Sequence, residues 1–449
     1  MEMGDDPLGL LLVPKPVKDS SLRPPAHGRD VDKKKESRPP WVLLDKTAYL
    51  AGADVRNATT ATSKTREGHE IQVTLCTAAR PPLVSYMCVH SPTLNPSDDF
   101  AREPKIIGVH DDLLLFRLTL GHGNRLNLSL SDYFVYQAAS VDDDGSRPPS
   151  LTRITHPGGN LFPDTHVGIL HDVPHHHPLP LAMSPHNPHA KQHYIVAALT
   201  PTRKPGGEYR LHLYHATTKQ WTTKLLQLGA LPPSPPLTFF FHHTDKRVAS
   251  TMLSLSSKPF HTRRDTQAAY IADGWTAAKW SWIAESGCWR MDCRLRSSQI
   301  PHHMVPTLPN YSEPQPDLEK LHVGHPVLSL HDTHLVYLMA KIEDRAHKAW
   351  ILPINLKDGV IQEPADFAGA DRTSGISETY VQTTISIYPQ TAPTAKKRKQ
   401  KLLGSSSKRR SETHSVTNVV LPVPGHGGQK LPDAGRTMET EFPEYMFLG

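Results

Sequence analysis

Residues 335–361 read LVYLMAKIEDRAHKAWILPINLKDGVI, and this stretch decides the fold class. Its first five residues form an apolar run of strand length, which suits a strand that is buried on both faces. From Trp350 to Leu356 apolar residues stand at alternate positions, and Asp358-Gly359 follows. Asp-Gly favours a tight β-turn because both residues tolerate a positive φ. The stretch therefore predicts consecutive antiparallel strands.

The same patterns recur along the chain. Residues 71–75 and 209–213 alternate apolar with other side chains, and residues 113–118 are almost wholly apolar. Alternation places one face of a strand on a core, so we expect Leu211 and Leu213 to be buried. Residues 216–219 separate two such patterns, as in a hairpin. No long stretch has helical period. We predict an all-β fold, either propeller-like or another multi-sheet β domain, although no kelch or WD repeat is visible.

Composition divides the chain into three parts. The 449 residues include 42 prolines, which are excluded from helix interiors and central strands. Residues 1–38 mix proline and charge and are predicted to be a disordered N-terminal segment. The ordered body is predicted over 39–388, with a His- and Pro-rich loop at 171–193 and a Pro-rich linker at 228–236. Residues 389–449 are predicted to be a disordered basic tail.

The positive charge of the chain is concentrated in that tail. The net charge is +6, but residues 396–410 carry eight basic residues and no acid, and the rest of the chain has 42 basic and 44 acidic residues. Short basic runs in accessible segments are typical of nuclear import signals. The candidate import residues are Lys396, Lys397, Arg398, Lys399, Lys401, Lys408, Arg409 and Arg410. We predict a nuclear location, with the cytoplasm as the alternative.

A second group of candidates is the histidine-rich segment. It contains His171, His175, His176, His177, His186, His189 and His193. Imidazole binds zinc, copper and nickel, but prolines separate these histidines and no cysteine or carboxylate stands at ligand spacing. We therefore predict no defined metal site, with His175, His176 and His177 as weak candidates that bind zinc loosely.

No catalytic constellation is recognisable in the sequence, so we predict a protein that is not an enzyme and has no cofactor. Asp111-Asp112 is expected to lie in a solvated turn. The four cysteines are too few for a disulfide scaffold, and Cys288 and Cys293 are expected to be buried free thiols rather than zinc ligands. The acidic start of the chain is unlike a signal peptide and no apolar run approaches membrane-spanning length, so we expect no membrane partner.

Several short motifs, taken in order, resemble a plant family that is greatly expanded in grasses and is defined by domain of unknown function 1618. They are PWVLLD (40–45), RNATTA (56–61), FPDTHVG (162–168), LYH (213–215), WTTK (221–224), GWTAA (274–278), HVGHP (322–326), YLMAK (337–341) and KAW (348–350). Together they cover about 39–388. The family typically has a further strand pair after the linker. Residues 239–266 diverge there, so that pair is expected to be deleted or replaced.

The resemblance implies a domain but no activity. We therefore expect an uncharacterised, non-enzymatic protein-interaction module with unknown protein partners. One alternative is a nuclear protein that associates with nucleic acid through its basic tail. This is not favoured, because a nucleic-acid binder usually spreads basic residues over a face of its fold. A second alternative is a degraded, non-functional family copy.

Overall fold

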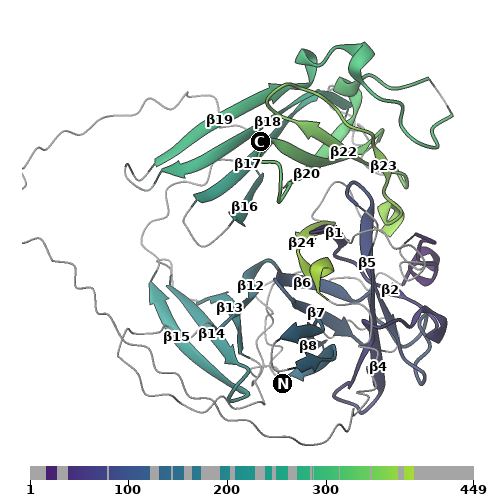
Figure 1. Ribbon diagram of the computed structural model, residues 1–449, viewed down its shortest axis with the longest axis vertical. Helices are drawn as coiled ribbons and strands as arrows, with labels where there is room; N and C mark the ends of the chain where they lie inside the picture. Colours follow the sequence, from purple (N-terminus) through teal and green to yellow (C-terminus); the bar gives the residue numbers. More distant parts are fainter. Residues whose placement is uncertain are drawn as a thin grey trace, which may run out of the picture. The chain divides into compact units, whose positions relative to one another are not determined.

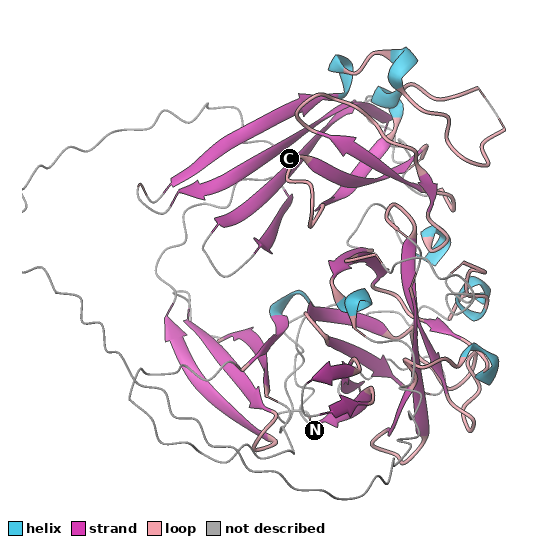
Figure 2. Ribbon diagram, viewed as in Figure 1, coloured by secondary structure: helices cyan, strands magenta, loops and turns pink. Residues whose placement is uncertain are grey.

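The computed structural model shows a β-rich body in which short helical turns connect the strands (Figures 1 and 2). The structure describes residues 17–27, 39–77, 80–121, 131–142, 145–155, 164–172, 193–202, 208–227, 238–244, 249–260, 271–283, 286, 288–312, 314–343, 346–372 and 379–388. Every helix in these ranges is a 3₁₀ turn of three or four residues. The all-β prediction is confirmed.

The strands form five larger sheets and one two-stranded ribbon. The first sheet has the order β24 (Tyr380–Thr383), β1 (Val42–Asp45), β5 (Val84–His90), β4 (Glu70–Cys76) and β3 (Ala61–Lys64), and β2 (Tyr49–Leu50) also pairs with β5. The second sheet consists of β11 (Ser150–Ile154), β8 (Ser131–Gln137), β7 (Leu113–Thr119) and β6 (Lys105–His110). The ribbon pairs β9 (Ser140–Asp142) with β10 (Gly145–Arg147).

The other three sheets are antiparallel meanders in chain order. The third consists of β12 (Val167–His171), β13 (Tyr194–Pro201), β14 (Glu208–His215) and β15 (Gln220–Gln227). The fourth consists of β16 (Thr238–Thr244), β17 (Ala249–Phe260), β18 (Ile271–Ile283) and β19 (Cys288–Arg296). The fifth consists of β20 (His322–Leu328), β21 (Leu335–Lys341), β22 (Trp350–Asn355) and β23 (Ala365–Asp366).

The 3₁₀ turns lie before, between and after these strands. They are η1 (Asp19–Leu22), η2 (Ala53–Val55), η4 (Asp164–His166), η5 (Ser297–Gln299), η6 (His302–Met304), η7 (Leu318–Lys320), η8 (Ala370–Arg372) and η9 (Ile385–Ile387). Their short length agrees with the absence of a helical period in the sequence.

Apolar clusters join neighbouring sheets. One cluster packs the first sheet on the second, another packs the second on the third, and a third packs the fourth on the fifth. A further apolar cluster packs the fifth sheet on the first. The last strand, β24, belongs to the first sheet and pairs antiparallel with β1. The described residues thus form a multi-sheet β architecture without a closed propeller or barrel.

Two apolar runs have the burial that the sequence predicts, and the alternating strands differ from it. Every residue of β7 and of β21 is buried. In β4 the polar face is buried as well, because it packs on the small cluster around Tyr49 and Tyr86. In β14 the buried residues are His212 and Tyr214, whereas Leu211 and Leu213 are half-buried. The prediction of the buried face of β14 was therefore wrong.

Hydrogen bonding explains the burial of His212. Its Nε2 lies 3.1 Å from Thr200 Oγ1 on β13, and its Nδ1 lies 3.0 Å from Thr223 Oγ1 on β15. A buried imidazole is tolerated when both nitrogens have partners. The hydroxyl groups of the two flanking strands thus permit a polar residue where the hydropathy pattern predicts solvent.

Residues 17–27 fall inside the segment predicted to be disordered and have a defined structure instead. Ser21 is fully buried, and its hydroxyl donates to Glu103 Oε1 at 2.9 Å. Tyr86 on β5 donates its hydroxyl to the Pro25 carbonyl at 2.6 Å, and the His27 ring packs edge-on against Tyr86. These contacts attach the segment to the first sheet.

A buried ion pair links the last part of the body to the first sheet. Arg372, on η8, pairs with the Asp45 carboxylate of β1 and also donates to the carbonyls of Thr47 and Ala48 at 3.0 and 3.2 Å. Its guanidinium lies 3.6 Å from the centre of the Tyr49 ring. Burial raises the pKa of Asp45 to about 6, against the opposing effect of Arg372.

The strand pair after the linker, expected to be deleted or replaced, is not deleted. Residues 238–244 and 249–260 form β16 and β17, which pair antiparallel from Thr238–Leu255 to Thr244–Ala249 and complete the fourth sheet. The linker at 228–236 and the tail at 389–449 lie outside the described residues.

Candidate functional site

The turn between β6 and β7 carries the residues with the most distinctive chemistry. His110 ends β6 and pairs with Leu113 of β7, so Asp111 and Asp112 form a two-residue turn. Asp111 has a φ of 50°, which aspartate adopts more readily than most residues with a side chain. The Asp111 carboxylate lies 3.7 Å from His110 Nδ1, and both side chains are substantially exposed. The turn thus presents an imidazole and a carboxylate side by side.

Asp112 is buried, contrary to the prediction of a solvated turn. Its Oδ1 lies 2.7 Å from His171 Nε2, and its Oδ2 accepts hydrogen bonds from Gln137 Nε2 at 3.0 Å and from Arg147 Nη2 at 2.9 Å. Burial alone would raise the pKa of Asp112. The hydrogen bonds from His171 and Gln137 outweigh that effect, and the pKa is held below its usual value.

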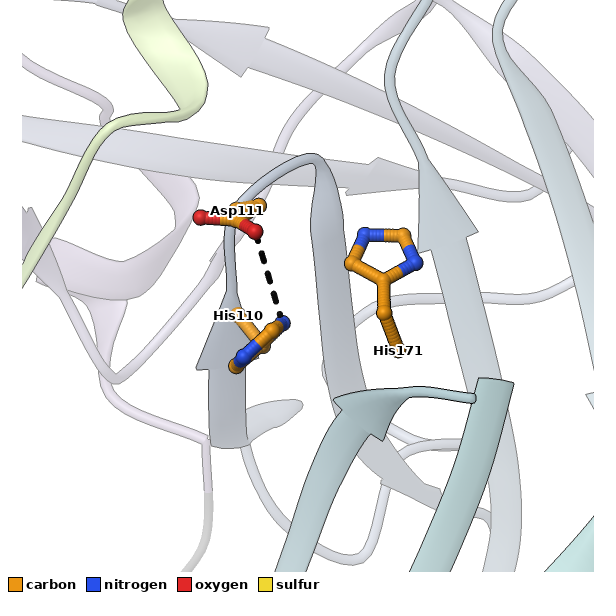
Figure 3. A group of neighbouring side chains, drawn as sticks. All are labelled: His110, Asp111 and His171. Carbon is orange, nitrogen blue, oxygen red and sulfur yellow. Dashed lines mark ion pairs between the residues drawn. The ribbon is translucent and has the colours of Figure 1, made fainter. Parts of the chain in front are cut away.

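His171 reaches this turn because β12 packs closely against β6. A Cβ atom on Gly108 of β6 would lie 3.4 Å from Ile169 Cγ2 and 3.5 Å from the Ile169 backbone nitrogen, which is van der Waals contact, so the two strands touch directly at this point. Two residues further along each strand, the rings of His110 and His171 meet edge to face with centroids 5.4 Å apart (Figure 3). The packing of the second sheet on the third thus assembles the site.

The two histidines have different protonation behaviour. The hydrogen bond to Asp112 raises the pKa of His171, although burial opposes it. Burial lowers the pKa of His110, against the opposing charge of Asp111. The pair therefore combines an imidazole that retains its proton with one that releases it readily.

His110, Asp111 and His171 together have the composition of a metal-binding group. One potential ligand atom from each residue lies within 4.8 Å of the others. The sequence pattern placed His171 in the histidine-rich segment but not among the weak candidate metal ligands. It did not indicate His110 as a candidate ligand. The weak candidates His175, His176 and His177 lie outside the described residues, and so do the import candidates at 396–410. The feature of the sequence that could have identified His110 as a candidate ligand is its position directly before the predicted Asp111-Asp112 turn.

A second surface of interest is the edge strand β19. Among the described strands β19 pairs only with β18, and most of its nine residues are exposed. It carries Arg290, Arg294 and Arg296, while Asp292 is its only acidic residue. Asp292 Oδ2 lies 3.6 Å from Lys279 Nζ, and its Oδ1 lies 3.7 Å from Arg290 Nη2. Neither Arg294 nor Arg296 forms an ion pair with a described residue, so their charges face solvent.

The cysteines are only partly as predicted. Cys288 is exposed and Cys293 is half-buried, so the expectation that both are buried was wrong. Cys76 and Cys88 are buried in the first sheet and form no disulfide. Burial raises the pKa of the Cys293 thiol, with Lys279 opposing this effect. All four cysteines belong to strands of the first and fourth sheets, whereas the β6–β7 turn belongs to the second.

Comparisons with known proteins do not identify a family for this chain. No family model matches it, and no curated protein matches it. A search of solved structures gave the tail fiber of Staphylococcus aureus phage P68, at 8% identity, covering 69% of this chain and 83% of that chain. The TM-score is 0.11, so this likeness carries no argument. Among the described helices there is no apolar one with the length needed to cross a membrane.

Proposed function

We propose that this protein is a non-enzymatic protein-interaction module, and that it binds an acidic, extended segment of a partner along the outer edge of β19. The observation that supports the proposal is the edge itself. It is a nine-residue strand that is paired on one side only among the described strands and is largely exposed. An extended peptide can add to such an edge through main-chain hydrogen bonds.

The positive charge of β19 indicates which kind of partner segment can pair with it. The three arginines of β19 repel a second copy of the same edge, which is a common protection against self-association. The same charges favour a strand that carries glutamate or aspartate, because cross-strand pairs of opposite charge are favourable. Met291, with 45% of its surface exposed, offers an apolar contact between the charged positions. We therefore expect the partner segment to alternate acidic and apolar residues.

The bulge in this strand limits where the partner can pair. The register between β18 and β19 shifts at Lys279–Trp280, which leaves Asp292 opposite no single residue of β18. A bulge interrupts a regular row of edge hydrogen bonds. Two continuous segments remain, residues 288–291 and Cys293–Arg296, and the second contains both arginines that lack a described ionic partner. We place the centre of the binding surface there.

A nuclear location and the resemblance to the domain of unknown function 1618 family remain parts of this proposal. Both rest on sequence motifs. The alternative, association with nucleic acid, is supported by the basic tail and by the arginines of β19. It differs in salt dependence, because phosphate contacts release counterions and weaken steeply as salt is added.

The proposal is tested by fluorescence anisotropy on the full chain. One labelled peptide alternates glutamate with valine and a second alternates lysine with valine, and a single-stranded oligonucleotide serves as the third probe. We expect binding of the glutamate peptide only, with an affinity about tenfold lower after Arg294→Glu and Arg296→Glu, as expected for two cross-strand charge pairs.

The matched control is Lys224→Glu on β15, the exposed edge of the third sheet, which should leave the affinity unchanged. Equal binding of the two peptides would contradict the proposal. Preferential, strongly salt-dependent binding of the oligonucleotide would favour the nucleic-acid alternative.

A further inference from the structure

The β6–β7 turn and the end of β12 bring together three side chains that commonly bind metals. His110 and Asp111 come from the turn and His171 comes from the third sheet (Figure 3). One nitrogen or oxygen of each lies within 4.8 Å of the other two. We propose that His110, Asp111 and His171 bind a single zinc ion.

The ligand chemistry selects zinc over the common hard cations. Two imidazole nitrogens and one carboxylate oxygen suit zinc, whereas calcium and magnesium prefer a shell made of oxygen atoms. Three protein ligands leave the fourth tetrahedral position to water or to an exchangeable group. The site is therefore of the open type, and a small anion or a side chain of a partner can occupy that fourth position.

The three ligand atoms must move closer together to bind one zinc ion, but only by a small distance. Zinc–nitrogen and zinc–oxygen bonds of about 2.0–2.2 Å place neighbouring ligand atoms about 3.3 Å apart. Asp111 and His110 have 57% and 43% of their side-chain surfaces exposed, so their side chains can rotate without disturbing the core. His171, which is less exposed, supplies the fixed side of the site.

Asp112 contacts the imidazole nitrogen of His171 that faces the proposed site. Its carboxylate touches the imidazole at 2.7 Å, while its other oxygen is held by Gln137 and Arg147. In Figure 3 this nitrogen lies on the side of the ring that faces His110 and Asp111, so zinc would take the place of the hydrogen bond and the Asp112 carboxylate would lie beside the ion. Asp111 and Asp112 together also balance the charge of a divalent ion. The packing of β12 on β6 thus brings the ligands close together before zinc binds.

The histidine-rich segment of the same chain supplies the competing explanation for any zinc that binds. His175, His176 and His177 can bind metals loosely because of their composition. A test must therefore separate the turn from this segment, and substitutions in each place do so within the full chain.

The experiment is isothermal titration of the full chain, freed of metal with a chelator, with zinc alone. A second titration with cobalt(II) reports tetrahedral coordination through its visible absorption. The variants are His110→Gln, His171→Gln, Asp112→Asn and a control with His175, His176 and His177 all changed to Asn. His110→Gln is the principal variant because its side chain is half-exposed, and circular dichroism checks that each variant folds.

We expect the wild type and the control to bind one zinc ion with equal affinity and to give the same cobalt spectrum. His110→Gln and His171→Gln should lose at least about tenfold in affinity, because each removes one of three ligands. Asp112→Asn should also weaken binding, because it removes a negative charge beside the ion. The proposal is overturned if the wild type binds no stoichiometric zinc. It is also overturned if the control loses the tight site, or if folded His110→Gln retains full affinity.

Discussion

Arg372→Met is expected to destabilise the body by about 3–5 kcal/mol, the usual cost of leaving one member of a buried ion pair uncompensated. The side chains of Arg372 and Asp45 are 0% and 3% exposed, so water cannot replace the lost partner. The same guanidinium also satisfies two carbonyls and packs on Tyr49. These contributions overlap because one side chain makes them all, so they are not added separately.

The assay is urea unfolding of the full chain at pH 7, followed by circular dichroism. The matched control is the double variant Asp45→Asn with Arg372→Met, in which neither charge of this pair remains. It should recover a large part of the loss, because replacing both members of a buried pair is often close to neutral. Equal destabilisation in the single and the double variant would refute the reasoning.

The pH dependence gives an independent check of the same pair. The pKa of Asp45 is about 6 in the folded chain. Its ordinary value is about 3.9, so the difference corresponds to about 3 kcal/mol. The folded state therefore binds a proton that the unfolded state releases between about pH 4 and pH 6, and this group lowers stability as the pH rises through that window. Compared with Asp45→Asn, the wild type should gain stability from pH 7 to pH 4.

Three further predictions concern the core, the contact between sheets and the tail. Leu338→Ala, in fully buried β21, should cost about 2–5 kcal/mol in urea unfolding, whereas exposed Val360→Ala should change stability by less than about 0.5 kcal/mol. Gly108→Leu should cost about 1–3 kcal/mol because it forces β6 away from Ile169. Gly168→Ala, whose Cβ would meet nothing within 4 Å, serves as the control and should unfold like the wild type. A fluorescent fusion of the full chain should be enriched in the nucleus and one lacking 396–410 should not; equal nuclear-to-cytoplasmic ratios would exclude an import role for the tail.

Local sequence patterns were sufficient to predict burial and turns where these depend on the residue types of one short stretch. The apolar runs of β7 and β21 can only be buried, and Asp358-Gly359 forms the expected turn, with Gly359 at a φ of 73°. The hairpin between β14 and β15 likewise turns at Lys219, which has a φ of 57°. These features depend on neighbours in the chain, and so the all-β class was predictable.

Features that depend on contacts between sheets were not predictable. Asp112 resembles a turn aspartate, but His171, Gln137 and Arg147 from three other strands bury it in hydrogen bonds. The alternation in β14 predicts that His212 faces solvent. It is buried instead because the hydroxyls of Thr200 and Thr223, on the two neighbouring strands, lie at hydrogen-bond distance from its ring nitrogens. For the same reason His110 could not be joined to His171 from the sequence, because nothing local indicates that β12 packs on β6.

The most direct test of the proposed interaction is hydrogen–deuterium exchange of the full chain, with and without the peptide that alternates glutamate and valine. Strand addition pairs backbone amides that otherwise exchange with solvent, so protection should appear in residues 293–296 of β19. The amides of β15, the exposed edge of the third sheet, should exchange at an unchanged rate. Protection confined to residues outside β19, or none at saturating peptide, would contradict the proposal that this edge is the binding surface.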